Sequence, residues 1–252
     1  MTPEDFTAAA ADFPEPFRLL VRESVESTND EVRVLARTGA ADGLIVLAEH
    51  QTAGRGRRGA AWFSPPGESL AFSILVRPRE AQALWPRLAL AAGLAVAEAV
   101  ESFGPQAGIK WPNDVWIGQR KTAGILVEAG SDFAVVGIGL NVNTTEFPPE
   151  VTNIATSLQM ETSQTLSRAE VLAKIIRKFA RRRQQIENDF DDLISAVRLR
   201  CVLTGKRVTL TTASGPQAGL VEGISAGGEL LLRSESGLER LLQADEIRLL
   251  PS

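Results

Sequence analysis

Residues 44–76 read LIVLAEHQTAGRGRRGAAWFSPPGESLAFSILV, and this stretch decides between fold classes. The apolar run at 44–49 predicts a buried strand, and SLAFSILVRP at 69–78 predicts another. Between them, GRGRRG at 54–59 matches the G-x-G-x-x-G pattern of dinucleotide-binding turns. That fold needs a helix directly after the third glycine, and the PPG at 65–67 excludes one. The sequence therefore predicts two strands joined by a loop.

The same loop also fails as a nucleotide P-loop, because Ala60 and Ala61 occupy the positions of the required Lys and Ser/Thr. It suits an anion in another way. Its glycines let backbone N–H groups approach a ligand, and Arg55 and Arg57 on either side of Gly56 can converge on one phosphate or carboxylate. Taken alone, the segment is equally compatible with a solvated surface loop.

The amino-acid composition excludes several classes of protein. The chain has 252 residues, 44% hydrophobic and 23% charged, which is typical of a soluble protein with a real core. Its 31 acidic residues outnumber 27 basic ones, which argues against a protein that coats nucleic acid. The single cysteine, Cys201, excludes an internal disulfide, and a catalytic triad could use only His50. We find no signal peptide and no apolar run of membrane-spanning length, so we expect a cytoplasmic protein.

Patterning along the chain predicts the remaining elements. We expect a loosely ordered lead-in before the first helix, a mostly apolar core helix, a ladder of short strands and a second long helix whose RKFARRR segment is a solvated face. After Cys201, short strands and Gly-rich turns predict an all-β barrel or sandwich of about fifty residues. The predicted ranges are 1–17 for the lead-in, a helix from STND (27–30) to Gly39, a helix at 80–103, strands over 107–142 with a hairpin turn at 118–121, a helix from Ser167, and a domain boundary near 199–203.

Three more segments place polar residues where strands end or turn: STND, KWPNDVWIGQRKTAGILVE at 110–128, and VVGIGLNVN at 135–143. Each taken singly is explained by a helix cap, a turn or a strand end. In this order, together with QTAGRGRRGAAW, they resemble the motifs of the biotin–protein ligases from about residue 24 to residue 143. The resemblance continues more weakly toward the C-terminus.

The resemblance implies an α+β fold. Its parts are a mixed-sheet catalytic domain of the class II-synthetase-like biotin ligase type over residues 1–200, and a small SH3-like β-barrel over 201–252. Some family members carry an N-terminal helix-turn-helix repressor domain. Only about twenty residues precede STND here, so the chain resembles the enzyme-only form. The sequence leaves open whether it is a monomer or a homodimer.

The activity implied is ATP-dependent biotinylation. Biotin and ATP, the latter as its Mg²⁺ complex, would give biotinyl-5′-AMP, and the biotinyl group would pass to one lysine of a biotin carboxyl carrier domain. No tightly bound cofactor, nucleic acid or membrane is expected. A lipoate or octanoate ligase or transferase is the enzyme alternative. A nucleic-acid-binding module that uses GRGRRG and RKFARRR is the alternative from another class.

The resemblance also assigns roles to residues. It implies a catalytic group of Lys121, Arg55, Arg57 and Asp114, with Asp114 as a candidate base for the acceptor lysine. It implies biotin-binding residues Ser27, Thr28, Asn29, Gln51, Arg55, Gly56, Arg57, Lys121, Gly124, Gly137 and Gly139. It implies ATP-binding residues Arg57, Trp62, Asn113, Lys121 and Asn141, with Asp114 and Asn113 as candidate Mg²⁺ ligands.

The residue types suit these roles. Cations offset the repulsion between a carboxylate and a triphosphate, Trp62 offers a stacking face for adenine, and Mg²⁺ prefers oxygen ligands. Strand alternation places His50 on the face opposite Gln51, away from the ligand. We also expect the loop to order only when an anion binds, because its arginines repel one another.

Overall fold

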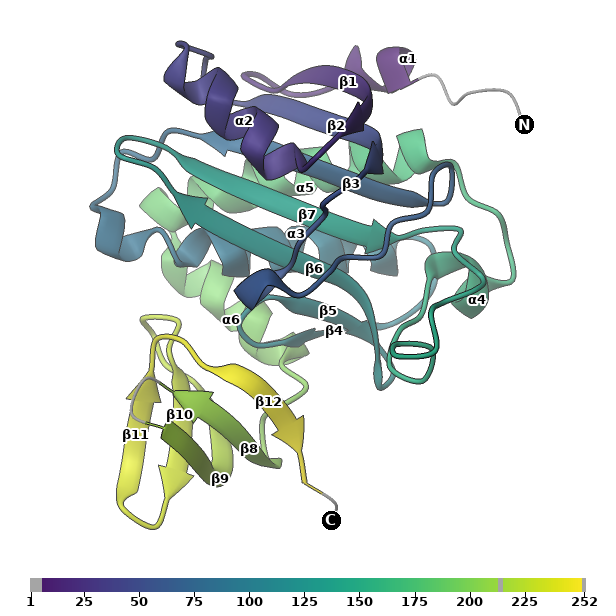
Figure 1. Cartoon of the computed structure of the whole chain (residues 1–252). Coiled ribbons are helices and arrows are strands. Elements are labelled where there is room, and N and C mark those ends of the chain that lie inside the picture. The colour runs from purple at the N-terminus through teal and green to yellow at the C-terminus, as the bar shows by residue number, and fades with distance from the viewer. Residues whose placement is uncertain (1–5, 213–214, 251–252) are drawn as a thin grey trace.

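The computed structural model describes residues 6–212 and 215–250. At its centre lies a seven-stranded mixed sheet in the order β1-β2-β3-β7-β6-β5-β4 (Figure 1). β1 runs parallel to β2, and the other neighbouring pairs are antiparallel. The strands are β1 (Arg18–Val25), β2 (Leu44–Gln51), β3 (Ser69–Val76), β4 (Ala107–Lys110), β5 (Asp114–Ile117), β6 (Arg120–Ala129) and β7 (Ala134–Asn141).

Helices cover the sheet unequally. One face carries α2 alone, whereas α3, α5 and α6 pack behind the other (Figure 1). Among the described residues, no other α-helix covers the α2 face of the sheet, so loops that connect the strands lie over the rest of it. The helices are α1 (Phe6–Ala10), α2 (Thr28–Arg37), α3 (Arg87–Glu101), α4 (Leu158–Thr162), α5 (Arg168–Asn188) and α6 (Phe190–Arg200), with short 3₁₀ turns η1 (Arg57–Gly59) and η2 (Gln82–Leu84).

The alternation of side chains along β7 explains why a pocket forms on the α2 face. Ala134, Val136, Ile138 and Leu140 all point into the main core beneath α3 and α5. On the opposite face, Val135 packs under α2, and the next two positions on that face are Gly137 and Gly139. Beyond α2 the sheet therefore presents backbone rather than side chains.

The apolar helix predicted at 80–103 appears as η2 and α3, and it lies in the core as expected. By length and composition alone, Gln82–Glu101 is apolar enough to cross a membrane, contrary to our expectation from the sequence. The window is 67% buried inside the protein, and α3 packs between the sheet and α5. Its apolar character is thus explained by burial.

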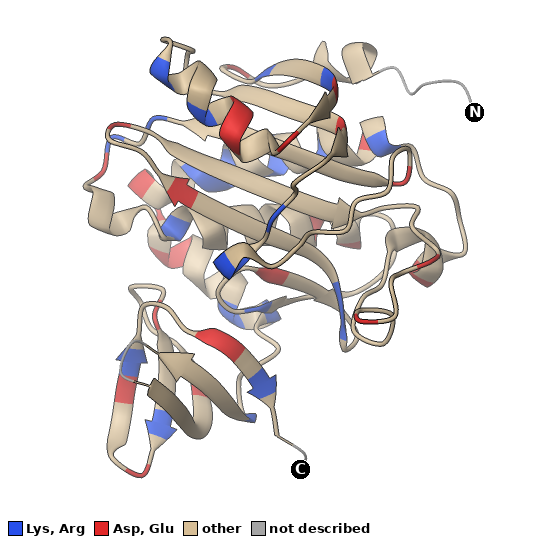
Figure 2. Ribbon diagram, viewed as in Figure 1, with Lys and Arg blue, Asp and Glu red and all other residues tan. Residues whose placement is uncertain are grey.

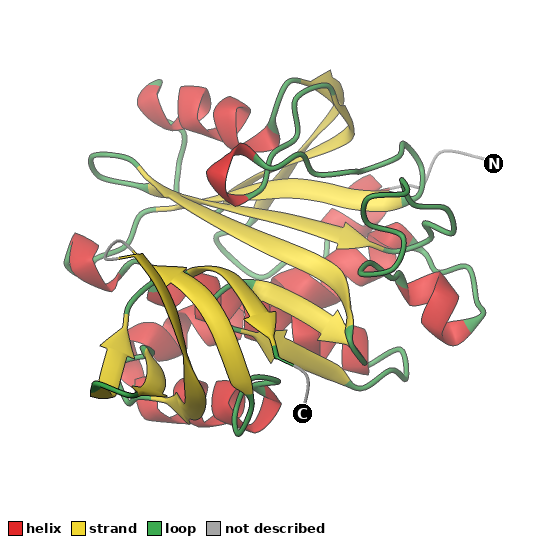
Figure 3. Ribbon diagram, turned by 60° about the horizontal axis from the view of Figure 1, so that its bottom comes forward, coloured by secondary structure: helices red, strands yellow, loops and turns green. Residues whose placement is uncertain are grey.

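The C-terminal strands form a second sheet, antiparallel and five-stranded, in the order β11-β10-β9-β8-β12 (Figure 3). This confirms the α+β class and the small all-β module expected from the Gly-rich texture after Cys201. The division at residue 200 itself stays a prediction. The strands are β8 (Arg207–Thr212), β9 (Gly215–Ile224), β10 (Leu230–Ser234), β11 (Gly237–Leu241) and β12 (Asp245–Leu249).

Two further expectations were wrong. From residue 6 onward the supposed lead-in is packed, because Phe6, Phe13 and Phe17 are buried against the core; β1, which follows, was not predicted. The RKFARRR segment is also not a simply solvated face. Phe179 is fully buried in it, and the buried Arg182 pairs with Glu98 of α3. Burial of a charge is tolerated there because it is paired and hydrogen-bonded.

Candidate active site

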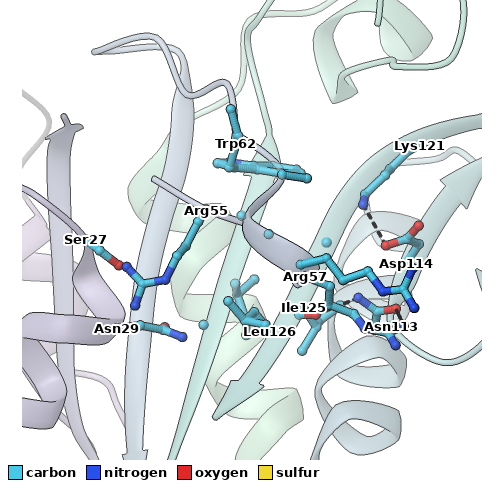
Figure 4. Close-up of a pocket in the computed structure, with 18 of the residues that line it drawn as sticks. Ser27, Asn29, Arg55, Arg57, Trp62, Asn113, Asp114, Lys121, Ile125 and Leu126 are labelled. Atoms are coloured by element: carbon cyan, nitrogen blue, oxygen red, sulfur yellow. Dashed lines mark hydrogen bonds and ion pairs between the residues drawn. The ribbon is translucent and has the colours of Figure 1, made fainter. Parts of the chain in front are cut away.

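A cavity of about 340 Å³ lies on the α2 face of the sheet (Figure 4). Its size is that of a small-molecule site. Every predicted site residue except Asn141 lines it, so segments far apart in the sequence meet here. The lining also includes residues that the sequence analysis did not select: Arg58, Ala60, Ala61, Ile125, Leu126, Ile138, Asp245 and Glu246.

One end of the cavity is a network of short polar side chains. The Thr28 backbone N–H donates to Gln51 Oε1 at 2.8 Å, and its hydroxyl donates to the same oxygen at 3.1 Å. Ser73 Oγ, fully buried on β3, lies 2.7 Å from Thr28 Oγ1 and 2.6 Å from Asn29 Oδ1. Asn29 Nδ2 donates to Glu128 Oε2 at 2.6 Å. Ser27 lines the same end. These bonds hold Thr28, Asn29 and Gln51 in defined orientations.

The glycines of β7 are required by what lies above them. A Cβ at Gly137 would stand 2.2 Å from Asn29 Oδ1, and one at Gly139 would stand 2.2 Å from the Trp62 ring. Both are impossible contacts, so the two missing side chains admit Asn29 at one end of the cavity and Trp62 at the other. Because these two glycines lack a Cβ, Asn29 and Trp62 can lie directly against the backbone of β7, which forms the floor of the pocket.

Arg55 is anchored on the α2 side of the cavity. Its guanidinium forms two hydrogen bonds with the Asp30 carboxylate, at 2.5 and 2.6 Å, and lies 3.8 Å from Glu128. The hydrogen bond from Arg55 lowers the pKa of Asp30, and the same bond raises the pKa of Arg55. Asp30 lies in the first turn of α2, where Ser27 occupies the N-cap position without a side-chain capping bond, contrary to the helix cap expected at STND.

Arg57 and Arg58 reach the opposite side. Arg57 donates to Asn113 Oδ1 at 3.2 Å and to Asp245 Oδ1 of β12 at 2.6 Å, and Arg58 lies 2.5 Å from Asp245 Oδ2. The repulsion expected among the loop arginines is therefore offset by carboxylates from other elements. Sequence reasoning missed Asp245 because it lies 188 positions from Arg57 in a different module.

Lys121 follows the turn of the β5–β6 hairpin, as predicted. Its Nζ lies 2.7 Å from Asp114 Oδ1 and 5.6 Å from the centroid of the Trp62 ring. Its backbone N–H donates to Ile154 O at 2.7 Å, which fixes the start of β6. The ammonium group consequently points into the cavity beside Asp114 and Trp62 (Figure 4).

Lys110, which the sequence analysis left without a role, stands near the same group. Burial lowers its pKa, the adjacent Lys121 lowers it further, and Asp114 acts in the opposite direction.

The two proposed Mg²⁺ ligands have different surroundings. Asn113 is tied to β6, since its Nδ2 donates to Ile125 O and its carbonyl accepts from Ile125 N, both at 2.8 Å. Its Oδ1 accepts from Arg57, whereas the Asp114 carboxylate faces Lys121. No group of three or more His, Cys, Asp or Glu that could hold a metal ion occurs within 6–212 and 215–250. Asp114 is the stronger oxygen candidate for a metal that arrives with a nucleotide.

Two residues lie outside the cavity. Asn141 is buried and donates to Thr156 O at 3.0 Å, and the Thr156 N–H in turn donates to Lys121 O at 2.9 Å. Asn141 thus supports the lysine from behind rather than lining the pocket. His50 is exposed and is not among the lining residues, in agreement with its expected position on the other face of β2.

Comparisons with known proteins agree with this geometry. Residues 21–143 match the model of the biotin/lipoate A/B protein ligase family. The bifunctional ligase/repressor BirA of Bacillus spizizenii is 34% identical over 90% of this chain and 73% of its own length. The biotin–[acetyl-CoA-carboxylase] ligase of Mycobacterium tuberculosis is 37% identical over 82% of this chain and 79% of its own.

Among solved structures, the biotin protein ligase of Aquifex aeolicus in complex with biotin and ATP superposes with a TM-score of 0.83. The two are 33% identical, and the match covers 93% of this chain and 99% of that one. The sequence match and the superposition of the fold agree. The chain described here belongs to the biotin/lipoate A/B protein ligase family, as one of its biotin–protein ligases.

Proposed function

We propose that the cavity over Gly137 and Gly139 is where this ATP-dependent biotin–protein ligase forms biotinyl-5′-AMP. The observation that carries the proposal is the convergence of Arg55, Arg57 and Lys121, from two separate elements, on one cavity. One anion would not need three cations. A carboxylate and a triphosphate that are brought together repel each other, and they would need several cations to offset that repulsion.

The first step requires charge neutralisation and alignment rather than a protein nucleophile. A biotin carboxylate oxygen attacks the α-phosphorus of ATP, the bond from that phosphorus to the bridging oxygen breaks, and pyrophosphate leaves. Lys121 is positioned to hold the carboxylate and the α-phosphate together and to offset the charge that develops on the phosphate oxygens. Asp114, which pairs with Lys121, would hold the Mg²⁺ that accompanies the nucleotide.

The two ends of the cavity suit the two substrates. We assign the ureido head of biotin to the end formed by Ser27, Thr28, Asn29 and Gln51, whose side chains offer both donors and acceptors. We assign adenine to the Trp62 side, where the indole lies against the backbone of β7 at Gly139. The reacting groups then meet between these ends.

In the second step, a carrier lysine amine attacks the acyl carbon of the mixed anhydride. The acyl–oxygen bond breaks, AMP leaves, and the amine loses a proton. Asp114, which lines the cavity beside Lys121, is our candidate acceptor for that proton. A biotin carboxyl carrier domain is the partner we propose, and the cytoplasm, where ATP is plentiful, the compartment.

Incubation with ATP, Mg²⁺, biotin and a carrier domain tests the proposal. We expect the carrier to gain one biotinyl group on one lysine by mass spectrometry, and to gain nothing when lipoate or octanoate replaces biotin. Lipoylation at a comparable rate, or no transfer of either acid, would contradict it.

A further inference from the structure

One carboxylate of the C-terminal module is bonded to two arginines of the loop over the cavity. Asp245 Oδ1 accepts from Arg57 at 2.6 Å, and its Oδ2 lies 2.5 Å from Arg58. The Asp245 side chain is 21% exposed, so solvent reaches it only in part. Figure 2 shows the basic part of the loop in front of the large sheet, close to the acidic start of β12.

Asp245 sits on a firmly attached support. The buried Trp111 Nε1 of the catalytic part donates to Gly228 O at 2.9 Å, and Arg198 Nε of α6 donates to Ile224 O at 2.7 Å. Around Asp245 itself, Ala244 and Ile247 are buried in the core. The carboxylate therefore has a defined position relative to the cavity.

The loop needs such a support. Residues 52–63, here called the arginine loop, contain short backbone contacts of their own, such as Gly56 N to Ala60 O at 2.7 Å. At the same time Arg58 adopts a left-handed backbone, with φ of +55°, which is unfavourable for a residue with a side chain. Arg55 is fixed to Asp30 at one side. Asp245 is the corresponding anchor at the other side.

We propose that Asp245 is a positioning residue through which the C-terminal module holds the Arg57–Arg58 half of the arginine loop over the cavity and retains the acyl adenylate. The retention part rests on the function proposed above. The module thereby takes part in the reaction through the position of the loop. Loss of the carboxylate frees one side of the loop while Arg55 stays bound to Asp30.

A competing role can be separated from this one. If Asp245 instead occupied Arg57 in place of a phosphate, its removal would strengthen ATP binding and speed adenylate formation. An anchor behaves differently: its removal loosens the Arg57 side of the arginine loop, so the adenylate forms no faster than in wild type and escapes sooner. The rates of adenylate formation and of adenylate release therefore distinguish the two roles.

The first test uses hydrogen exchange of residues 54–61 in the full chain without substrates, and so does not depend on activity. We expect Asp245→Asn to speed exchange about fivefold, as loss of a partly exposed ion pair does, and Asp245→Glu to restore most of the protection. The matched control is Glu222→Gln, which removes the carboxylate that pairs with Arg233 in the same module. It should leave the exchange rate of residues 54–61 unchanged.

The second test follows release of biotinyl-5′-AMP from the preloaded enzyme. We expect Asp245→Asn to release it about fivefold faster and to form it no faster than wild type does. Unchanged loop exchange, or faster adenylate formation in Asp245→Asn, would overturn the anchor role. If the wild-type chain made no adenylate at all, the proposed function would fail, and the exchange experiment would still decide whether Asp245 anchors the loop.

Discussion

Lys121 Nζ and Asp114 Oδ1 lie 2.7 Å apart on the two strands of the β5–β6 hairpin. A carboxylate this close to the central cation would repel a triphosphate unless a divalent ion came between them. We therefore expect Asp114→Asn to raise the Mg²⁺ concentration that gives half-maximal adenylate formation by about tenfold or more. Titration of Mg²⁺ at saturating ATP and biotin measures this. An unchanged Mg²⁺ requirement would leave Asp114 outside the metal site.

Gly137 and Gly139 offer a matched pair of substitutions on one strand. An added Cβ meets Asn29 at the first position and Trp62 at the second, both at 2.2 Å. We expect Gly137→Ala to raise the KM for biotin and Gly139→Ala to raise the KM for ATP, each by about tenfold or more, because each displaces a different wall of the pocket. Steady-state kinetics with each substrate varied in turn gives the four values. Equal effects of both variants on both substrates would contradict the assignment of the two ends.

Ser73 orients the biotin end from below although it does not line the cavity. Its removal leaves buried polar atoms of Thr28 and Asn29 short of a partner, so Ser73→Ala should cost about 1–3 kcal/mol in the free energy of unfolding and raise the KM for biotin. The control is Ser69→Ala on the same strand, where a buried hydroxyl bonds Thr144 at 3.0 Å. It should cost similar stability and leave the KM for biotin unchanged. Parallel urea denaturation and kinetics compare them.

The Asp30–Arg55 pair gives stability a defined pH dependence. The hydrogen bond from Arg55 lowers the pKa of Asp30 below its ordinary 3.8, so the folded protein binds that proton less readily than the unfolded chain does. The stabilisation is complete above that ordinary value and is lost as the pH falls through the lowered pKa.

We therefore expect Asp30→Asn to lower the urea midpoint at pH 7 and to differ less from wild type at about pH 2.5, because below the ordinary value of 3.8 the stabilisation from the lowered pKa declines. The variant Asp132→Asn, which removes an exposed carboxylate paired with Arg77, should show a smaller difference at pH 7. A gap between wild type and Asp30→Asn that stayed the same at both pH values would show that the pair does not act through charge.

Local pattern was sufficient to predict much of the fold. The strands at 44–51 and 69–76, the hairpin before Lys121 and the capped helix after Ser167 all follow from apolar runs, turn residues and caps that act within a few positions. The N-terminal segment was mispredicted because its prolines were visible in the sequence, whereas the core that buries Phe6, Phe13 and Phe17 was not. Burial against distant elements overrides local propensity there.

For the site, the sequence predicted the residues that line the cavity but not the residues that hold them in place. The order of motifs indicated which residues gather in the cavity, and all but Asn141 do. The pattern contains no information on the partners that hold them, because those contacts join residues far apart in the chain. Ser73 under Asn29 and Asp245 beside Arg57 are side chains of ordinary strands, and only the folded arrangement gives them a role.

The central claim is that cations from the arginine loop and the β5–β6 hairpin bring two anions together, and Lys121 is the cation that the hairpin contributes to the cavity. The most direct measurement is the single-turnover rate of biotinyl-5′-AMP formation by Lys121→Ala at saturating biotin and Mg²⁺-ATP, with Lys178→Ala on α5 as the control. We predict a loss of about 10²–10³-fold for Lys121→Ala and none for the control. A wild-type rate of adenylate formation in Lys121→Ala would contradict the account.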